Sequence, residues 1–181
     1  AATVLVDRTD CCSTVTVGVP VHLRSGRGAA RGAARVVGPL METFPLDVAV
    51  EPDDTYASLH RRVQRGLLDL LGRAVPGTSP DQDFGVVVNV LTARYADVAG
   101  LSCRAEWVHS GAVEPAHLLR VQAHDYRGDD LRLELDVNAA LGDPATCARV
   151  PGHLRTVLVD LVAAPDRSIG EVVLPDAEEL R

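Results

Sequence analysis

The stretch VVGPLMETFPLDV, residues 36–48, has the composition of a buried strand but contains two acids. On strict strand alternation Glu42 lies on the same face as Leu40, Phe44 and Leu46. An unpaired carboxylate buried among such residues would cost on the order of several kcal/mol, because the charge loses its hydration there. The stretch therefore predicts a core strand, and it also requires a partner for Glu42.

The preceding segment, TVTVGVPVHLR (residues 14–24), alternates in the same way. Valines occupy every second position from residue 15 to residue 21, so they form a face suited to packing on a core. The opposite face is small and polar, and Gly18 and Pro20 limit its bulk and its hydrogen bonding. We expect this second face either to line a channel or to let another segment approach closely.

The segment after residue 52 predicts the clearest helix of the chain. Apolar residues recur there at helical spacing, and Asp53 or Asp54 is placed to cap the first turn. The cationic residues of this helix, Arg62 among them, fall largely on the solvent side. Gly72 and the Val-Pro-Gly sequence that follows end the helix.

The next part of the chain predicts strands. Four segments carry the alternation or the composition of strands: residues 84–91, 103–110, 118–126 and 130–138. The sequence YRGDD joins the last two, which is typical of a hairpin.

The C-terminal part predicts a helix with an interruption. Asp143 is placed to cap it and Pro144 suits its first turn. Pro151 removes a helical hydrogen bond and, with Gly152, interrupts the helix, so we expect a helix proper at about residues 153–163 with a separate turn or short helix before it. Residues 166–181 are expected to form an extended exit segment toward a following linker.

Composition excludes several classes of function. The 181 residues fit one α/β domain, residues 1–181. A net charge of −7 and an aromatic content of 3% argue against a nucleic-acid partner. No run of apolar residues is long enough to span a membrane.

The cysteines predict neither disulfides nor a metal site. Cys11, Cys12, Cys103 and Cys147 match no small-domain disulfide framework, and no CxxC or nearby histidine pair accompanies them. We therefore expect reduced, structural thiols, no bound metal and a cytoplasmic location.

No catalytic signature is present. The sequence has no P-loop, dinucleotide fingerprint, nucleophile elbow or HExxH motif. His124 stands beside Asp125, but adjacent strand residues point to opposite faces, and a general base needs an orienting partner within reach. A surface strand histidine is the main interpretation of His124, and a catalytic base is the alternative. We assign no catalytic residue to this chain.

A glycine-rich loop after residue 24 carries a strip of arginines. Arg24, Arg27, Arg31 and Arg35 recur at short intervals within it. The ordinary interpretation is a solvated, mobile loop. The alternative is a cationic strip that binds a phosphate or an acidic partner surface.

Two motifs in order resemble the C-terminal half of condensation domains from non-ribosomal peptide synthetases. A valine-rich strand ending in G-x-P-x-x-x-R is matched by Gly18, Pro20 and Arg24. A following motif close to IGxFVNTLPLR is matched in part by residues 37–46, and an amphipathic helix comes next. The closing strand, helix and exit of the family are similar to residues 131–180, so the resemblance covers nearly the whole chain.

The resemblance implies a chloramphenicol-acetyltransferase-like half-domain, which is an α/β fold of the α+β sandwich kind with a largely antiparallel or mixed sheet and helices packed on one face. In the family two such lobes enclose a tunnel, and carrier proteins deliver substrates on phosphopantetheine arms from opposite ends. The catalytic histidine of the family lies in a His-His-x-x-x-Asp-Gly motif of the N-terminal lobe, which is not found here. The chain would then supply a tunnel wall, the floor and a latching segment. Its implied partners are an N-terminal lobe, peptidyl carrier proteins and neighbouring synthetase domains, and no cofactor is bound directly.

The resemblance also assigns roles to particular residues. It places Gly18, Pro20, Arg24, Glu42 and Thr43 at the tunnel wall. Glu42 stands where the family has Asn, so it would face the wet tunnel or pair with an arginine such as Arg24 or Arg35.

Other positions depart from the family pattern. Asp47 stands where the family has Arg, and the family's HQDYPFE is replaced by GRAVPGT, which retains only Pro76. These departures leave two alternatives open: a non-catalytic docking module for a carrier protein or tailoring enzyme, with Arg27, Arg31 and Arg35 as its docking strip, and the equivalent lobe of an epimerisation domain.

Overall fold

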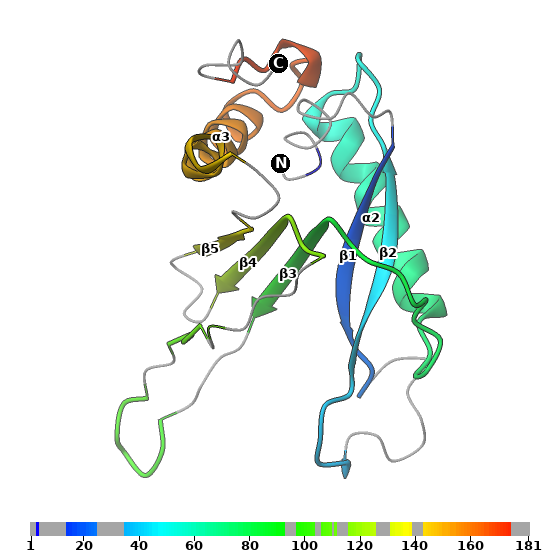
Figure 1. Cartoon of the computed structure of the whole chain (residues 1–181), viewed down its shortest axis with the longest axis vertical. Helices are drawn as coiled ribbons and strands as arrows, with labels where there is room; N and C mark the ends of the chain where they lie inside the picture. The colour runs from blue at the N-terminus through cyan, green and yellow to red at the C-terminus, as the bar shows by residue number, and fades with distance from the viewer. Residues whose placement is uncertain are drawn as a thin grey trace.

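A computed structural model describes residues 3, 14–24, 35–92, 97–103, 106–109, 111, 116–125, 131–138 and 143–174. These residues form one mixed five-stranded sheet with two long helices (Figure 1). The strands are β1 (Thr14–His22), β2 (Met41–Ala49), β3 (Val86–Thr92), β4 (Leu119–Asp125) and β5 (Arg132–Val137). The helices are α2 (Tyr56–Arg73), α3 (Pro144–Ala163) and the short 3-10 helix η2 (Ile169–Glu171). The α+β class with a mixed sheet is thus confirmed.

The sheet has the order β2-β1-β3-β4-β5 and consists of two ladders with a narrow junction. β1 and β2 pair antiparallel along their whole length, and β4 pairs with both β3 and β5. The parallel junction between β1 and β3 is formed only by Val17↔Val86 and Gly18↔Val87. Beyond these residues the two strands diverge, which Figure 1 shows as a wedge that widens toward their C-terminal ends.

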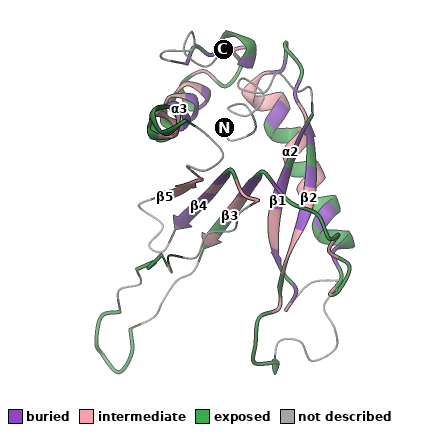
Figure 2. Ribbon diagram, in the orientation of Figure 1, coloured by how far each residue is buried: buried purple, intermediate pink, exposed green. Residues whose placement is uncertain are grey.

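The core lies between the sheet and both long helices, which cover the same face. Alternate residues of β1 and β2 point into it, as the two sequence patterns predict, with Val17 4% and Val48 2% exposed. Leu59 of α2 and Val157 of α3 complete it from the helix side. Figure 2 shows this core as the buried segments of the strands and the inner stripes of the helices. In the described part of the chain the other face of the sheet carries no helix, and we call it the helix-free face.

The start of α2 differs from the prediction. Thr55 is the N-cap, and its hydroxyl accepts from the Ser58 main chain at 3.1 Å while the Ser58 hydroxyl accepts from Thr55 at 2.9 Å. Asp54 is buried, at 6% exposure, and forms an ion pair with Arg62 of α2. Arg62 is therefore turned inward, because it meets Asp54 and also donates to the carbonyl of Ala49 at 2.7 Å.

α3 runs without a break from Pro144 to Ala163, with Pro151 inside it. The predicted separate turn is wrong. The lost hydrogen bond at Pro151 is offset by packing on both sides of it, since Val150 is half-buried against the core and Leu154 is 2% exposed.

The strand predicted at residues 103–110 and the extended exit segment predicted at residues 166–181 also differ from the structure. Among the described residues of the segment 103–110, Cys103 and residues 106–109 form no strand. The first half of the expected exit segment packs on the domain instead of extending away, because Ile169 and Val172 are buried and the Ser168 hydroxyl donates to the carbonyl of Pro52 at 2.9 Å. Residues 175–181 lie outside the described residues.

Candidate functional site

The helix-free face of the sheet brings together Gly18, Pro20 and Thr43, three of the residues predicted to line a tunnel. Pro20 lies directly opposite Thr43 in the β1–β2 register. Gly18 is covered by the ring of Phe84, because a Cβ built on it would lie 2.8 Å from Phe84 Cγ. Of the two expectations for this face, close approach of another segment is confirmed at Gly18.

Glu42 has a partner that differs from the two predicted arginines. Its Oε1 accepts from the main-chain N–H of Gly77 at 2.7 Å, and its Oε2 accepts from that of Ser79 at 3.2 Å. The Ser79 hydroxyl in turn donates to the carbonyl of Thr43 at 2.5 Å. Glu42 therefore ties the loop after α2 to the start of β2, on the core-facing side of that strand.

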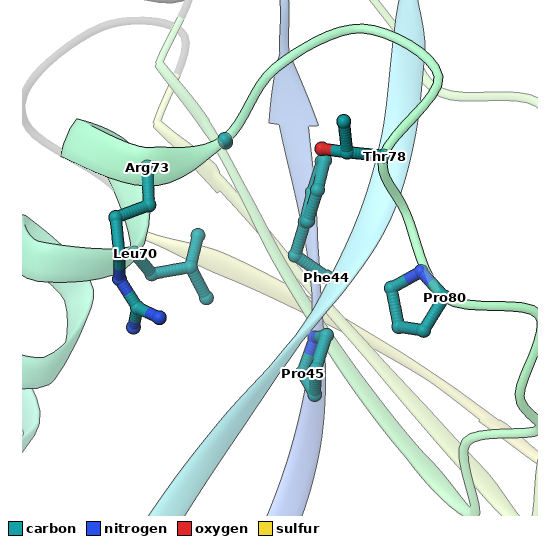
Figure 3. Close-up of a pocket in the computed structure, with 7 residues that line it drawn as sticks. Phe44, Pro45, Leu70, Arg73, Thr78 and Pro80 are labelled. Atoms are coloured by element: carbon teal, nitrogen blue, oxygen red, sulfur yellow. The ribbon is translucent and has the colours of Figure 1, made fainter.

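This loop closes a pocket between β2 and the end of α2. The pocket has a volume of about 210 Å³, and Figure 3 shows Phe44 and Pro45 on its β2 side, Leu70 and Arg73 on its α2 side, and Thr78 on the loop. Thr78 lies between the two residues that Glu42 binds, so the Glu42 contacts hold one wall of the pocket in place.

The arginines of the predicted strip do not act together in the described part of the chain. Arg24 donates to the carbonyls of Val36 and Gly38 and so braces the turn before β2. Arg35 is exposed. Arg27 and Arg31 lie outside the described residues, so the docking strip stays a prediction.

A polar network that the sequence did not predict occupies the same helix-free face on β4 and β5. Arg120 of β4 donates from Nε to Asp136 of β5 at 2.7 Å, across a register pair. His109 joins them, with its Nε2 3.4 Å from Asp136 Oδ1 and its Nδ1 accepting from the main chain of Gly111 at 3.0 Å. The segment around residue 109 thus lies against this face.

His124 is the most buried polar residue of this network, and its interpretation as a surface histidine is wrong. Its side chain is 1% exposed, with Nε2 3.6 Å from Glu134 Oε2. The ring of Trp107 covers it, at a centroid distance of 5.6 Å. Glu134 also pairs with Arg132 at 3.0 Å. The alternation of β4 could have placed His124 on the polar face, but it does not show that Trp107 packs over this position.

Gln122 and Asn89 lie between these groups. They are register partners on β4 and β3, and they point to the helix-free face with Arg120. Gln122 is only 3% exposed, and its Nε2 has no hydrogen-bond partner in the described part of the chain. The face therefore combines buried polar side chains with the small residues of β1, which is an arrangement suited to facing another protein surface or a polar substrate.

Other kinds of site find no support in the described residues. No group of histidine, cysteine and acidic side chains among them could hold a metal ion. Cys103 and Cys147 are free thiols, whereas Cys11 and Cys12 lie outside the described residues. No helix in the described part is long and apolar enough to cross a bilayer.

Comparison with solved structures identifies the architecture. The chain superposes on the first condensation domain of the CDA synthetase with a TM-score of 0.67 and 20% identity, covering 96% of this chain and 40% of that one. The fold is that of a condensation-domain half. The starter condensation domain of rhizomide synthetase matches with a TM-score of 0.79 and 21% identity in a double mutant bound to C8-CoA and Leu-SNAC, and with 0.72 and 23% in a single mutant.

The condensation-domain matches cover this chain almost completely, whereas the chain spans only about two fifths of each condensation domain. No protein-family model matches the sequence, and no curated protein matches it significantly.

Proposed function

We propose that this chain forms the C-terminal lobe of a non-ribosomal peptide synthetase condensation domain. The match of 96–97% of the chain to some 40% of condensation domains carries the proposal. The lobe acts together with an N-terminal lobe, which brings the catalytic histidine, and amide bonds form between substrates that two carrier proteins hold on phosphopantetheine arms. The complex of one neighbour with C8-CoA and Leu-SNAC supports an acyl thioester and an aminoacyl thioester as the substrate classes.

In this role the chain positions substrates and does no proton transfer of its own. Pro20 and Thr43 form a low, weakly polar part of the helix-free face along which an arm passes, and Gly18, which the ring of Phe84 covers, bounds that part. Arg24 and Glu42 hold the turn before β2 and the loop after α2 through main-chain contacts. Fixing both reactants in one orientation supplies much of the rate enhancement expected for such a reaction, and the histidine of the partner lobe removes the proton of the attacking amine.

Reuniting the lobes tests the proposal. The chain is co-expressed with an N-terminal lobe that carries an intact His-His-x-x-x-Asp-Gly motif, and the complex is supplied with an acyl-loaded and an aminoacyl-loaded carrier protein. Mass spectrometry of the carriers should show the amide product only when both lobes are present. Replacement of the second histidine of the motif by alanine is the control, and it should abolish the product.

The same assay separates the two alternatives. A stable complex of the lobes with a carrier protein that forms no amide, with every donor supplied, contradicts the proposal and supports a docking module. Inversion of the α-carbon of a carrier-bound residue without amide formation supports the lobe of an epimerisation domain.

A further inference from the structure

The edge of the sheet at β2 is closed to further strands. The odd residues of β2 turn their main-chain groups away from β1, so these groups form the edge. Pro45 has no N–H to offer there. The carbonyl of Thr43 accepts from the Ser79 hydroxyl at 2.5 Å, and that of Ala49 accepts from Arg62 at 2.7 Å. A strand that approached β2 would therefore find its hydrogen-bonding positions missing or already occupied.

The opposite edge of the sheet, at β5, is open (Figure 1). Asn138 donates to the carbonyl of Leu118 at 3.0 Å in the β4–β5 ladder, so the even residues of β5 face β4. The odd residues, Leu133, Leu135 and Val137, turn their N–H and C=O groups outward. No strand pairs with this edge in the described part of the chain, and β5 has no proline that would block pairing.

The sequence along this edge is complementary to itself. Residues 131–135 read Leu-Arg-Leu-Glu-Leu. In a second copy that runs antiparallel with Leu133 opposite Leu133, Arg132 of each copy lies opposite Glu134 of the other. Displacing the pairing toward the end of the strand would instead place Glu134 opposite Glu134, or opposite Asp136. Charge therefore selects the register that is centred on Leu133.

The side chains on both faces of β5 fit this pairing. On the core side Leu135 packs against the core, whereas Leu131 is 64% exposed and would be covered by Leu135 of the second copy. On the helix-free face the Arg132 side chain is 58% exposed and lies 3.0 Å from Glu134. Two such pairs side by side form a ring of four charges that alternate in sign, and networked charges stabilise more than an isolated surface pair.

We propose that β5 is an interface for a second copy of this chain, in which the two β5 strands pair antiparallel about Leu133 and join two sheets into one. The outward main-chain groups exchange hydrogen bonds, and the Arg132–Glu134 pairs between the copies specify the register. A two-fold axis perpendicular to the sheet places both copies of α3, which contacts β5, on one face of it. The association involves no residue assigned to the tunnel wall, so it goes beyond the proposed function and does not depend on it.

Sedimentation velocity of the 181-residue chain, between about 10 µM and about 1 mM, tests this association. The sedimentation coefficient should rise with concentration toward that of a dimer. Arg132→Glu places like charges opposite each other in both pairs and should weaken dimerisation about tenfold. Arg155→Glu makes the same change of charge at an exposed position of α3 and should leave dimerisation unchanged. A chain that stays monomeric, or a dimer that both substitutions weaken equally, overturns the proposal.

The alternation of β5 provides a second measurement on the unmodified chain. The amides of Leu133 and Leu135 point outward and would enter hydrogen bonds between the copies, whereas those of Arg132 and Glu134 already face β4. In nitrogen-15 spectra, hydrogen exchange of the outward amides should slow as the concentration rises, and that of the inward amides should change much less. Equal changes in both sets, or slowing confined to other parts of the chain, would show that a different surface associates.

A synthetic peptide with the sequence of residues 130–136 distinguishes a second copy from a free strand. If β5 is the interface, the peptide should compete with dimerisation and shift the sedimentation coefficient toward that of the monomer. If the peptide instead slows exchange of the outward amides of a chain that remains monomeric, a free strand occupies the edge and the proposed dimer is wrong.

Discussion

Glu42 on β2 accepts a 2.7 Å hydrogen bond from the main chain of Gly77, thirty-five residues further along the chain. The second oxygen of the same carboxylate binds Ser79. An acid in an apolar strand is thus the anchor of the loop that ends the α2 segment. This explains how Glu42 can share a strand face with Phe44 and Leu46, since its carboxylate reaches the loop beyond the edge of the core.

Replacing Glu42 by Gln tests this anchor. The amide keeps one acceptor oxygen but places an NH₂ group opposite a main-chain donor, so we expect a loss of about 1–2 kcal/mol in the free energy of unfolding. Urea denaturation measures it. Asp47→Asn on the same strand is the matched control, because Asp47 is exposed and its partner is the hydroxyl of Thr16. Equal effects of the two substitutions would contradict the anchoring role of Glu42.

Gly18→Ala should destabilise the junction of the two ladders. The new methyl group would lie 2.8 Å from Phe84 Cγ and 3.0 Å from Thr43 Cγ2, so the ring must move. We expect a cost of about 1–3 kcal/mol, which is typical of overpacking, and thermal unfolding measures it.

Two variants check the cause of that cost. Gly85→Ala is the control, since a Cβ there meets nothing within 4 Å. Adding Phe84→Leu to Gly18→Ala should recover part of the stability. If the double mutant loses as much stability as the two single substitutions together, the ring contact is not the cause of the cost.

The sequence predicted the fold best in the strands where apolar and polar residues alternate, because the alternation indicates which side chains are buried. β1 and β2 follow their valine and leucine alternation, and Val17 and Val48 are buried as expected. The segment 103–110 has a similar composition, but a strand also needs a neighbour to pair with, and the sequence does not state whether one is present. The same limit applies to Asp54, whose cap-like position was evident but whose ion pair with Arg62 depends on the packing of the helix.

The candidate site was predictable only in its small residues. Gly18 and Pro20 stand out because they interrupt an otherwise valine-rich strand, and both lie on the helix-free face. The partner of Glu42 was missed because main-chain donors of a loop leave no mark in the sequence. His124 was misplaced because the sequence does not show that Trp107, which lies in a segment of irregular structure, packs over it.

The Asp54–Arg62 ion pair should make stability fall in acid. Burial opposes ionisation of Asp54, but hydrogen bonds from Arg62, Ser58 and the Glu51 main chain outweigh it, and the pKa of Asp54 lies below its usual 3.8. Because this pKa is lower in the folded state, the contribution of Asp54 is complete above pH 3.8. It is lost as the pH falls below 3.8 through the folded-state pKa.

Asp54→Asn measures this contribution. At pH 7 we expect a loss on the order of 2 kcal/mol, since the substitution leaves a partly buried guanidinium without its carboxylate. The difference from the unmodified protein should shrink as urea denaturation is repeated from pH 5 down to pH 2. Asp69→Asn is the control, because the Asp69–Arg73 pair is 70% and 74% exposed and should contribute little at any pH. A difference that stays constant below pH 3.8 would refute the linkage.

Trp107 should report on the integrity of the helix-free face. It is the single tryptophan of the chain, and its ring packs against His124, which is 1% exposed. Replacing His124 by Ala removes the group that Trp107 covers and leaves a gap, so we expect a red shift of the fluorescence and a loss of about 2–3 kcal/mol. His22→Ala, at an exposed position of β1, is the control and should change neither quantity.

The fluorescence also distinguishes a local change from a global one. If Trp107 is held on the sheet by His124, then the emission of the His124→Ala variant is already shifted in the folded state, where far-UV circular dichroism shows native secondary structure. If instead the emission of the folded variant equals that of the unmodified protein, the segment around Trp107 is held by other contacts, such as the His109–Asp136 pair at 3.4 Å. An added Asp136→Asn substitution would then be the change that shifts the emission.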